Sequence, residues 1–332
     1  MTNKLKFNDD FKYERLYGTI SGYTTTYNCF NLGIPFEQSI RSFLGFCDEV
    51  VVLDGCSDDG THEKLLELQQ EFGEGKLQVY QNEFDLTDPS IDGSQKSFAR
   101  ALCQHEFLIQ FDGDEIANED DYNKWKMITK RFPKDADILH LPVVELWGDL
   151  EHATGRHHAW KWRMSRNKPE ITHGINKNAR LTNEETGMVY AKKGKSDGCE
   201  MINAMTLEML PHVGFYNSRF EIARLQMPEE YANGMNEIFD KLPSVWHTSW
   251  LDLPNKVKQL QPGGMWDRLW SLLFQEEAQN RFPGVDFSKQ GEVDDLVREL
   301  YVSGGETSDQ VKYKFELRKK APKLLQEWWD NA

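Results

Sequence analysis

Short apolar segments alternate with amphipathic segments along the first 120 residues, and no other feature restricts the fold as strongly. Residues 49–54 (EVVVLD) and 106–111 (EFLIQF) are nearly continuous apolar runs, which is typical of strands covered on both faces. Strands are predicted over residues 18–26, 49–54, 77–80 and 106–111, and helices over residues 35–46, 61–72 and 95–103. This alternation predicts an α/β fold with a Rossmann-like, mostly parallel central sheet flanked by helices.

Further along the chain, the alternation of strand and helix signals is less regular. A helix is expected over residues 118–131, with Asn118 as its N-cap, and a strand over residues 137–146. Residues 147–220 read as strands and long loops, and from about residue 228 the signals are mainly helical. No linker separates this last third, so we expect a helical C-terminal extension that packs on the sheet.

Composition excludes several classes of protein. The net charge is -15, whereas sequence-independent binding to nucleic acid or to an anionic membrane needs a cationic surface. No apolar run reaches the roughly 20 residues of a membrane span, and the first residues lack the apolar core of a secretory signal. The five cysteines form no Cys-x-x-Cys pair. We therefore expect a cytoplasmic protein with reduced thiols.

Polar residues follow the predicted strands at one edge of the sheet. They are Tyr27-Asn28, Asp54 and Asp112, and ligands of such sheets bind beyond the carboxyl ends of the strands. In Asp112-Gly113-Asp114, two carboxylates on an extended chain point the same way and suit Mg²⁺ or Mn²⁺. An ordinary turn is the alternative, because Asp and Gly are common in turns.

Five segments in this order resemble the family 2 glycosyltransferases, which have the GT-A fold and a DxD metal motif. They are residues 25–28 (TTYN), 39–44 (SIRSFL), 50–61 (VVVLDGCSDDGT), 97–100 (SFAR) and 107–115 (FLIQFDGDE). The resemblance covers about residues 18–120, with weaker similarity to about residue 250. It implies transfer of a sugar from a nucleotide-sugar, with a UDP-sugar expected, to an acceptor hydroxyl with inversion.

The resemblance also implies roles for individual residues. Thr25, Tyr27 and Asp54 would line the nucleoside pocket, and Arg100 would contact the nucleotide or its diphosphate. A solvated helix face is the alternative for Arg100. Asp112 and Asp114 would hold Mn²⁺ or Mg²⁺ on the diphosphate, and Asp112 would thereby also contact the donor. The sequence departs from the family at Gly55, where many members carry a second acid.

Inversion needs a base that takes the acceptor proton. The candidates are Asp197, which we favour, then Glu145, and also Asp149 and Glu200, each with a plain surface acid as the alternative. In many GT-A enzymes a late histidine completes the metal shell, and His247 in residues 245–250 (VWHTSW) is similar. A packed core histidine is the alternative for His247.

One basic and aromatic segment stands out in this acidic chain, residues 157–166 (HHAWKWRMSR). Aromatic faces pack on sugar C–H surfaces and Arg binds phosphate, while a strand with buried Trp and exposed bases is the alternative. The two histidines lack the spacing of a hydrolytic zinc motif.

We expect residues 1–120 to form the nucleotide-sugar-binding half, residues 121–227 the acceptor-side half and residues 228–332 the helical extension. Two other functions stay open. One is an inactive nucleotide-sugar or carbohydrate-binding protein on the same scaffold. The other is a nucleotidyltransferase, which the absence of Lys and Arg from residues 24–36 (TTTYNCFNLGIPF) disfavours.

Overall fold

The structure is a computed structural model that describes residues 17–88, 91–132, 134, 137–154, 160–169, 171, 173, 195–196, 199–203, 228–274, 282, 284–303 and 314–331. Its strands are β1 (Ile20–Thr26), β2 (Glu49–Asp54), β3 (Leu77–Gln81), β4 (Phe107–Gln110), β5 (Glu115–Ala117), β6 (Ile138–Glu145), β7 (His152–Thr154), β8 (Trp160–Arg166), β9 (Lys195–Ser196), β10 (Cys199–Asn203), β11 (Val245–His247) and β12 (Lys314–Glu316). Its helices are α1 (Cys29–Leu32), α2 (Phe36–Leu44), α3 (Thr61–Phe72), α4 (Ile91–Ala101), α5 (Tyr122–Arg131), α7 (Pro228–Lys241), α8 (Leu253–Gln259), α9 (Met265–Phe274), α11 (Gln290–Ser303) and α12 (Lys323–Asn331).

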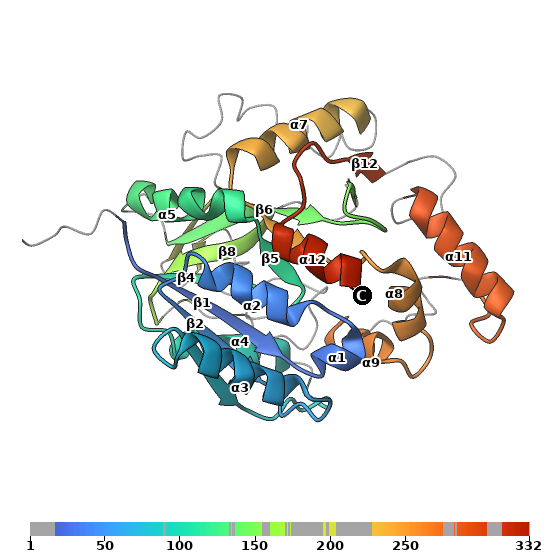
Figure 1. The fold of residues 1–332 in the computed structure, drawn as a ribbon, viewed down its shortest axis with the longest axis horizontal. Helices are drawn as coiled ribbons and strands as arrows, with labels where there is room; N and C mark the ends of the chain where they lie inside the picture. The colour runs from blue at the N-terminus through green and yellow to red at the C-terminus, as the bar shows by residue number, and fades with distance from the viewer. Residues whose placement is uncertain are drawn as a thin grey trace, which may run out of the picture.

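A ten-stranded sheet with the strand order β3-β2-β1-β4-β8-β6-β10-β9 organises the molecule (Figure 1). The strand β11 pairs with β6 and with β5 beside this row. The pairs among β3, β2, β1 and β4 are parallel, but β8 runs antiparallel to both β4 and β6. The predicted α/β architecture, a central sheet flanked by helices, is confirmed, with one correction: the sheet is mixed rather than mostly parallel.

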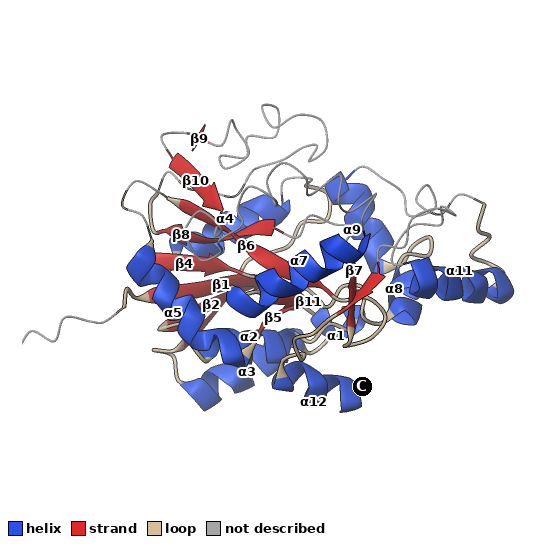
Figure 2. Ribbon diagram, turned by 90° about the horizontal axis from the view of Figure 1, so that it is seen from above, coloured by secondary structure: helices blue, strands red, loops and turns tan. Residues whose placement is uncertain are grey.

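Strand β2 explains why the sheet is covered on both faces. Successive side chains of a strand point to opposite faces, so Val50 and Val52 join the core under α2 and α3, while Val51 and Leu53 join a smaller core under α4. Figure 2 shows α2, α3, α5 and α12 on one face of the sheet and α4 on the other. The apolar run therefore buries every residue of β2.

Local signals in the sequence account for the helices around this sheet. The helix α2 buries Phe36, Ile40 and Phe43 and turns Arg41 outward, where it pairs with Glu71 of α3. Asn118 accepts a hydrogen bond from the Asp120 amide and caps the short 3-10 helix Glu119–Asp121, which precedes α5, so the cap is confirmed but the predicted helix over 118–131 begins as a 3-10 turn.

Two of the C-terminal helices, α8 and α9, lie at the carboxyl edge of the sheet. Figure 1 shows α8 and α9 beside α1, at the end toward which the arrow of β1 points. A second apolar core joins α8 and α11 to the segment after β6 through Trp147, Trp250 and Leu300.

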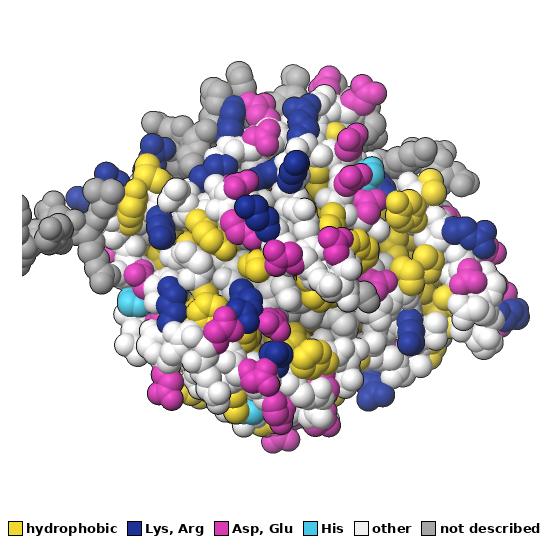
Figure 3. Space-filling model, in the orientation of Figure 1, with side chains coloured by type: hydrophobic (Ala, Val, Ile, Leu, Met, Phe, Trp, Pro, Cys, Tyr) yellow, Lys and Arg dark blue, Asp and Glu magenta, His cyan; other side chains and the backbone are white. Residues whose placement is uncertain are grey.

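No helix in the described part of the chain has the length and apolar character to cross a bilayer. On the face drawn in Figure 3, basic and acidic side chains intermingle, so the described residues form no continuous basic patch there.

Helix α3 offers a matched test of the packing. Leu65 is fully buried and its neighbour Leu66 is exposed. We expect Leu65→Ala to lower the free energy of unfolding by about 2–5 kcal/mol, because it leaves a cavity in the core. Leu66→Ala should cost less than about 1 kcal/mol. Urea denaturation measures both, and equal losses would contradict the assigned helix face.

Candidate functional site

The acids that follow β4 lie in a tight turn. The Asp112 carbonyl accepts a hydrogen bond from the Glu115 amide at 2.9 Å, and the Asp112 amide donates to the Glu115 carboxylate at 3.1 Å. The Ser39 hydroxyl of α2 donates to the Glu115 carbonyl at 2.5 Å and anchors the turn. Asp112 and Asp114 consequently face different partners, which corrects the expectation that both carboxylates point the same way along an extended chain.

Asp112 faces two cations. One of its carboxylate oxygens lies 2.9 Å from Lys96 Nζ of α4, and the other lies 3.2 Å from a guanidinium nitrogen of Arg163 on β8. Burial alone raises the pKa of Asp112, but Lys96 and Arg163 outweigh burial and hold that pKa well below its ordinary value. The Asp112 side chain is 31% exposed, so a ligand can reach the place where these charges meet.

Asp114, His247 and Glu145 form a carboxylate–imidazole–carboxylate chain. His247 Nε2 lies 3.2 Å from the Asp114 carboxylate, and His247 Nδ1 is hydrogen-bonded to Glu145. Pairing of β11 with β6 places His247 opposite Glu145. Burial lowers the pKa of His247, but Glu145 and Asp114 outweigh burial and raise it to about 10. Both ring nitrogens face carboxylates, so a packed core histidine does not describe His247.

Both carboxylate oxygens of Glu145 have a partner in this cluster. Its second oxygen lies 3.1 Å from Lys161 Nζ of β8, and its side chain is only 4% exposed. A general base must reach the acceptor hydroxyl, whereas this carboxylate holds His247 in place. The structure therefore brings Glu145 to the site, where its carboxylate supports His247. Its role as the base stays a prediction.

Lys161 and Arg163 complete the cluster from one face of β8, where residues two apart share a side. The Arg163 guanidinium pairs with Glu115 as well as with Asp112. Burial lowers the pKa of both bases, but the surrounding carboxylates outweigh burial and raise it. The basic and aromatic segment 157–166 thus supplies the site with two cations, a use that spacing alone did not reveal.

The predicted nucleoside side lies where β1 and β2 end. Thr25 and Tyr27 are half-buried there, and the Tyr27 ring stacks on Phe84 with 5.0 Å between centroids. Asp54 is fully buried, and its carboxylate accepts hydrogen bonds from the Thr26 hydroxyl and the Ser57 amide, each at 3.0 Å. Asp54 thus ties the ends of β1 and β2 together beneath the Tyr27–Phe84 stack.

The same stack explains the glycine at position 55. A Cβ on Gly55 would lie 2.7 Å from Phe84 Cβ and 2.9 Å from Tyr27 Cδ2, closer than side-chain atoms approach one another. An acid therefore does not fit at this position while the two rings are stacked.

Arg100 has a structural place that the sequence did not predict. Its guanidinium donates to the Ile171 carbonyl at 2.7 Å, to the Ser165 hydroxyl at 2.8 Å and to the Arg166 carbonyl at 2.7 Å. The residue is only 4% exposed. Arg100 therefore fastens α4 to β8 and the segment after it, while Lys96, one turn earlier on α4, faces Asp112. This corrects the expectation that Arg100 meets the nucleotide.

Of the remaining base candidates, the side chain of only Asp149 is described. Asp197 lies outside the described residues, and the side chain of Glu200 is likewise not described. Asp149 pairs with His152 at 2.8 Å and Lys314 at 3.3 Å, away from Asp114.

The side chains of this cluster suit a divalent ion that binds together with a phosphate-containing ligand. In the described part of the chain, no group of three or more His, Cys, Asp or Glu side chains is arranged to hold a metal ion. Mg²⁺ and similar ions need only one or two protein ligands when substrate phosphates and waters complete the shell. Asp114 and His247 provide an oxygen and a nitrogen 3.2 Å apart. The carboxylate of Glu145 on the far ring nitrogen is the usual support of a metal-binding histidine.

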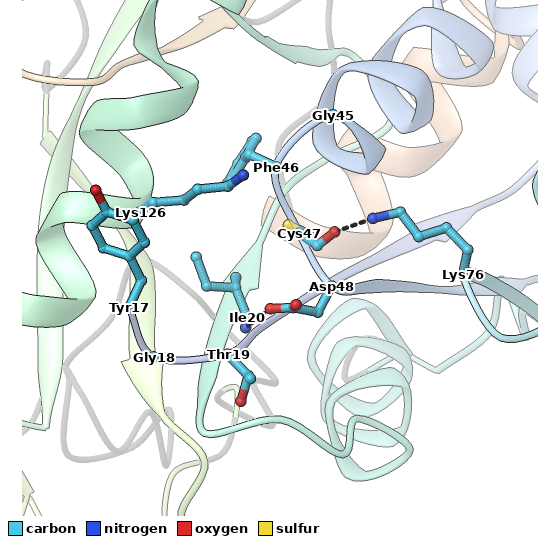
Figure 4. Close-up of a pocket in the computed structure, with 10 residues that line it drawn as sticks. All are labelled: Tyr17, Gly18, Thr19, Ile20, Gly45, Phe46, Cys47, Asp48, Lys76 and Lys126. Atoms are coloured by element: carbon cyan, nitrogen blue, oxygen red, sulfur yellow. Dashed lines mark hydrogen bonds between the residues drawn. The ribbon is translucent and has the colours of Figure 1, made fainter. Parts of the chain in front are cut away.

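A cavity of about 290 Å³ lies at the opposite edge, where β1 and β2 begin (Figure 4). Lys76 points across its rim and donates to the Cys47 carbonyl, and Asp48 accepts from the Ile20 amide at 2.8 Å. The carboxyl edge, not this one, gathers the buried acids and bases.

No protein-family model and no curated protein sequence matches the chain. Among solved structures, S. aureus TarS 1–349 is 14% identical with a TM-score of 0.38, over 91% of this chain and 100% of that chain. The same fragment in complex with UDP-GlcNAc is 16% identical with a TM-score of 0.36, over the same shares. Mannosyltransferase PcManGT from Pyrobaculum calidifontis, in complex with GDP-Man and Mn²⁺, is 13% identical with a TM-score of 0.37, over 87% of this chain and 88% of that chain.

The hydrogen bonds of Arg100 generate a prediction. We expect Arg100→Met to lower the free energy of unfolding by about 2–4 kcal/mol, because three buried acceptors lose a charged donor. The same change at Arg298, whose side chain is largely exposed, should stay within about 0.5 kcal/mol. Chemical denaturation of both variants gives the comparison. An Arg100→Met protein as stable as the parent that has lost nucleotide binding would instead put Arg100 in the phosphate site.

Proposed function

We propose that this chain is a metal-dependent glycosyltransferase of the GT-A type, similar to family 2, that uses a UDP-sugar. The observation that carries the proposal is the row of paired side chains Asp114, His247 and Glu145 at the carboxyl edge of the sheet. A carboxylate and an oriented imidazole suit an ion shared with a diphosphate. An aromatic stack on the neighbouring strand ends suits a nucleoside.

Each side chain then has a part in donor binding. Asp114 and His247, with Asp112 at the edge, would hold Mn²⁺ or Mg²⁺, which as a Lewis acid stabilises charge on phosphate oxygens. Lys96 and Arg163 pair with Asp112 at the same edge, and their positive charge would stabilise the departing nucleoside diphosphate. Glu145 keeps the ring of His247 turned toward Asp114.

The acceptor side is proposed from the sequence alone. Asp197 is the base that takes the proton from the acceptor hydroxyl, so that oxygen attacks the sugar from the face opposite the diphosphate and the configuration inverts. The acceptor is a carbohydrate or another hydroxyl compound. A cytoplasmic location also stays a prediction.

A thermal-shift series tests the proposal. It measures the Tm of the protein with UDP, UDP-sugars and GDP-sugars, and each ligand is tested with Mn²⁺, with Mg²⁺ and with EDTA. A ligand at 100 times its Kd stabilises the folded state by about 2.7 kcal/mol, which corresponds to a Tm rise of several degrees. We expect UDP and UDP-sugars to raise the Tm with Mn²⁺ and much less with EDTA. Release of UDP from the stabilising sugar nucleotide, with water as a poor acceptor, would then demonstrate turnover.

A pair of histidine variants provides the control. His247→Gln should lose the metal-dependent part of the shift, whereas His152→Gln, whose ring pairs with Asp149 away from the site, should retain it. A shift equal with and without metal would contradict the metal site. No shift with any nucleotide would overturn the proposed function.

A further inference from the structure

Lys256 of α8 is a buried cation that the proposed function does not yet use. The residue is only 3% exposed. Its Nζ donates to the Ser249 hydroxyl at 2.8 Å and lies 3.4 Å from the centroid of the Trp266 ring and 5.4 Å from that of Trp250. Aromatic faces attract a cation and also exclude water from it. The charge of Lys256 is therefore weakly screened and acts strongly on its surroundings.

The segment that carries Ser249 is fastened to the acidic turn. The Thr248 amide and hydroxyl both donate to the Asp114 carbonyl, at 2.9 Å and 3.0 Å. Ser249 follows Thr248 directly, so Lys256 contacts the residue next to the one that fastens the acidic turn.

Helix α8 also reaches the nucleoside side. The Asn255 amide group donates to the Leu32 carbonyl at 3.2 Å, and that of Gln259 donates to the Asn31 carbonyl at 2.9 Å. Both carbonyls belong to α1, which begins two residues after Tyr27. In Figure 1, α8 and α1 lie together at the carboxyl end of β1. Helix α8 therefore contacts α1 on the nucleoside side and, through Ser249, the segment that fastens the acidic turn.

We propose that Lys256 stabilises the diphosphate of the nucleotide-sugar donor, so that α8 and α9 form part of the donor site. This inference rests on the proposed function and deepens it. The desolvated charge of Lys256 favours the phosphate groups over the uncharged nucleoside.

Three variants and two ligands test the proposal on the full chain with Mn²⁺. Lys256→Met keeps the length of the side chain and removes its charge, Lys256→Arg keeps the charge, and Lys258→Met removes a charge from the exposed side of the same helix. The ligands are UDP and uridine, and titration calorimetry gives their Kd values.

We expect Lys256→Met to weaken UDP binding about 10- to 100-fold, as for a lost charge-assisted contact, and to leave uridine binding unchanged. Lys256→Arg should restore most of the affinity for UDP, and Lys258→Met should match the parent chain. Equal UDP binding by Lys256→Met and the parent would overturn the inference. So would parallel losses for UDP and uridine, because those indicate a purely structural role. A parent chain that binds neither ligand would overturn the proposed function itself, and this inference with it.

Trp266→Leu provides a second route if Lys256→Met does not fold. It keeps the ammonium group but removes the ring 3.4 Å from it. We expect a several-fold weaker affinity for UDP and unchanged binding of uridine. Unchanged affinity for both ligands would overturn the inference.

Discussion

Burying a charge costs several kcal/mol unless a partner of opposite sign lies in contact with it, and this constraint shapes the carboxyl edge of the sheet. Asp112, Asp114, Glu115 and Glu145 are gathered there, and Lys96, Lys161, Arg163 and His247 face them. The strand β8, which runs antiparallel between β4 and β6, supplies some of these partners of opposite sign. Because β8 begins where its neighbours end, its first residues bring Lys161 and Arg163 beside the acids. The mixed sheet and the charge cluster therefore have one physical explanation.

The same edge connects distant parts of the chain. His247 comes from the short strand that follows α7, and the residues after it fasten the acidic turn to α8. Helix α8 in turn contacts α1 above the nucleoside side. The C-terminal third is thus attached to the proposed donor site at several points, rather than packed only on the outside of the sheet.

The strands with continuous apolar runs were predictable from the sequence. The predicted bounds of β2 and α3 match the structure, because burial on both faces and a clear helical period leave few alternatives. Asp112, Asp114, Glu145 and His247, which the sequence offered as metal ligands or as a base, lie together at this edge. Their pairing was not predictable, because it depends on a turn after β4 and on the direction of β8. Lys96 was not predicted to face Asp112, because the sequence does not say which turn of α4 faces the acids.

The ligands of Mn²⁺ test the central claim most directly. Electron spin-echo modulation on the chain with Mn²⁺ and UDP detects a nitrogen that is bound to the ion. We expect coupling to an imidazole nitrogen in the parent chain and its loss in His247→Gln, with phosphorus coupling from UDP in the parent chain. Phosphorus coupling without any nitrogen coupling in the parent chain would contradict the claim that Asp114 and His247 hold the ion of the donor.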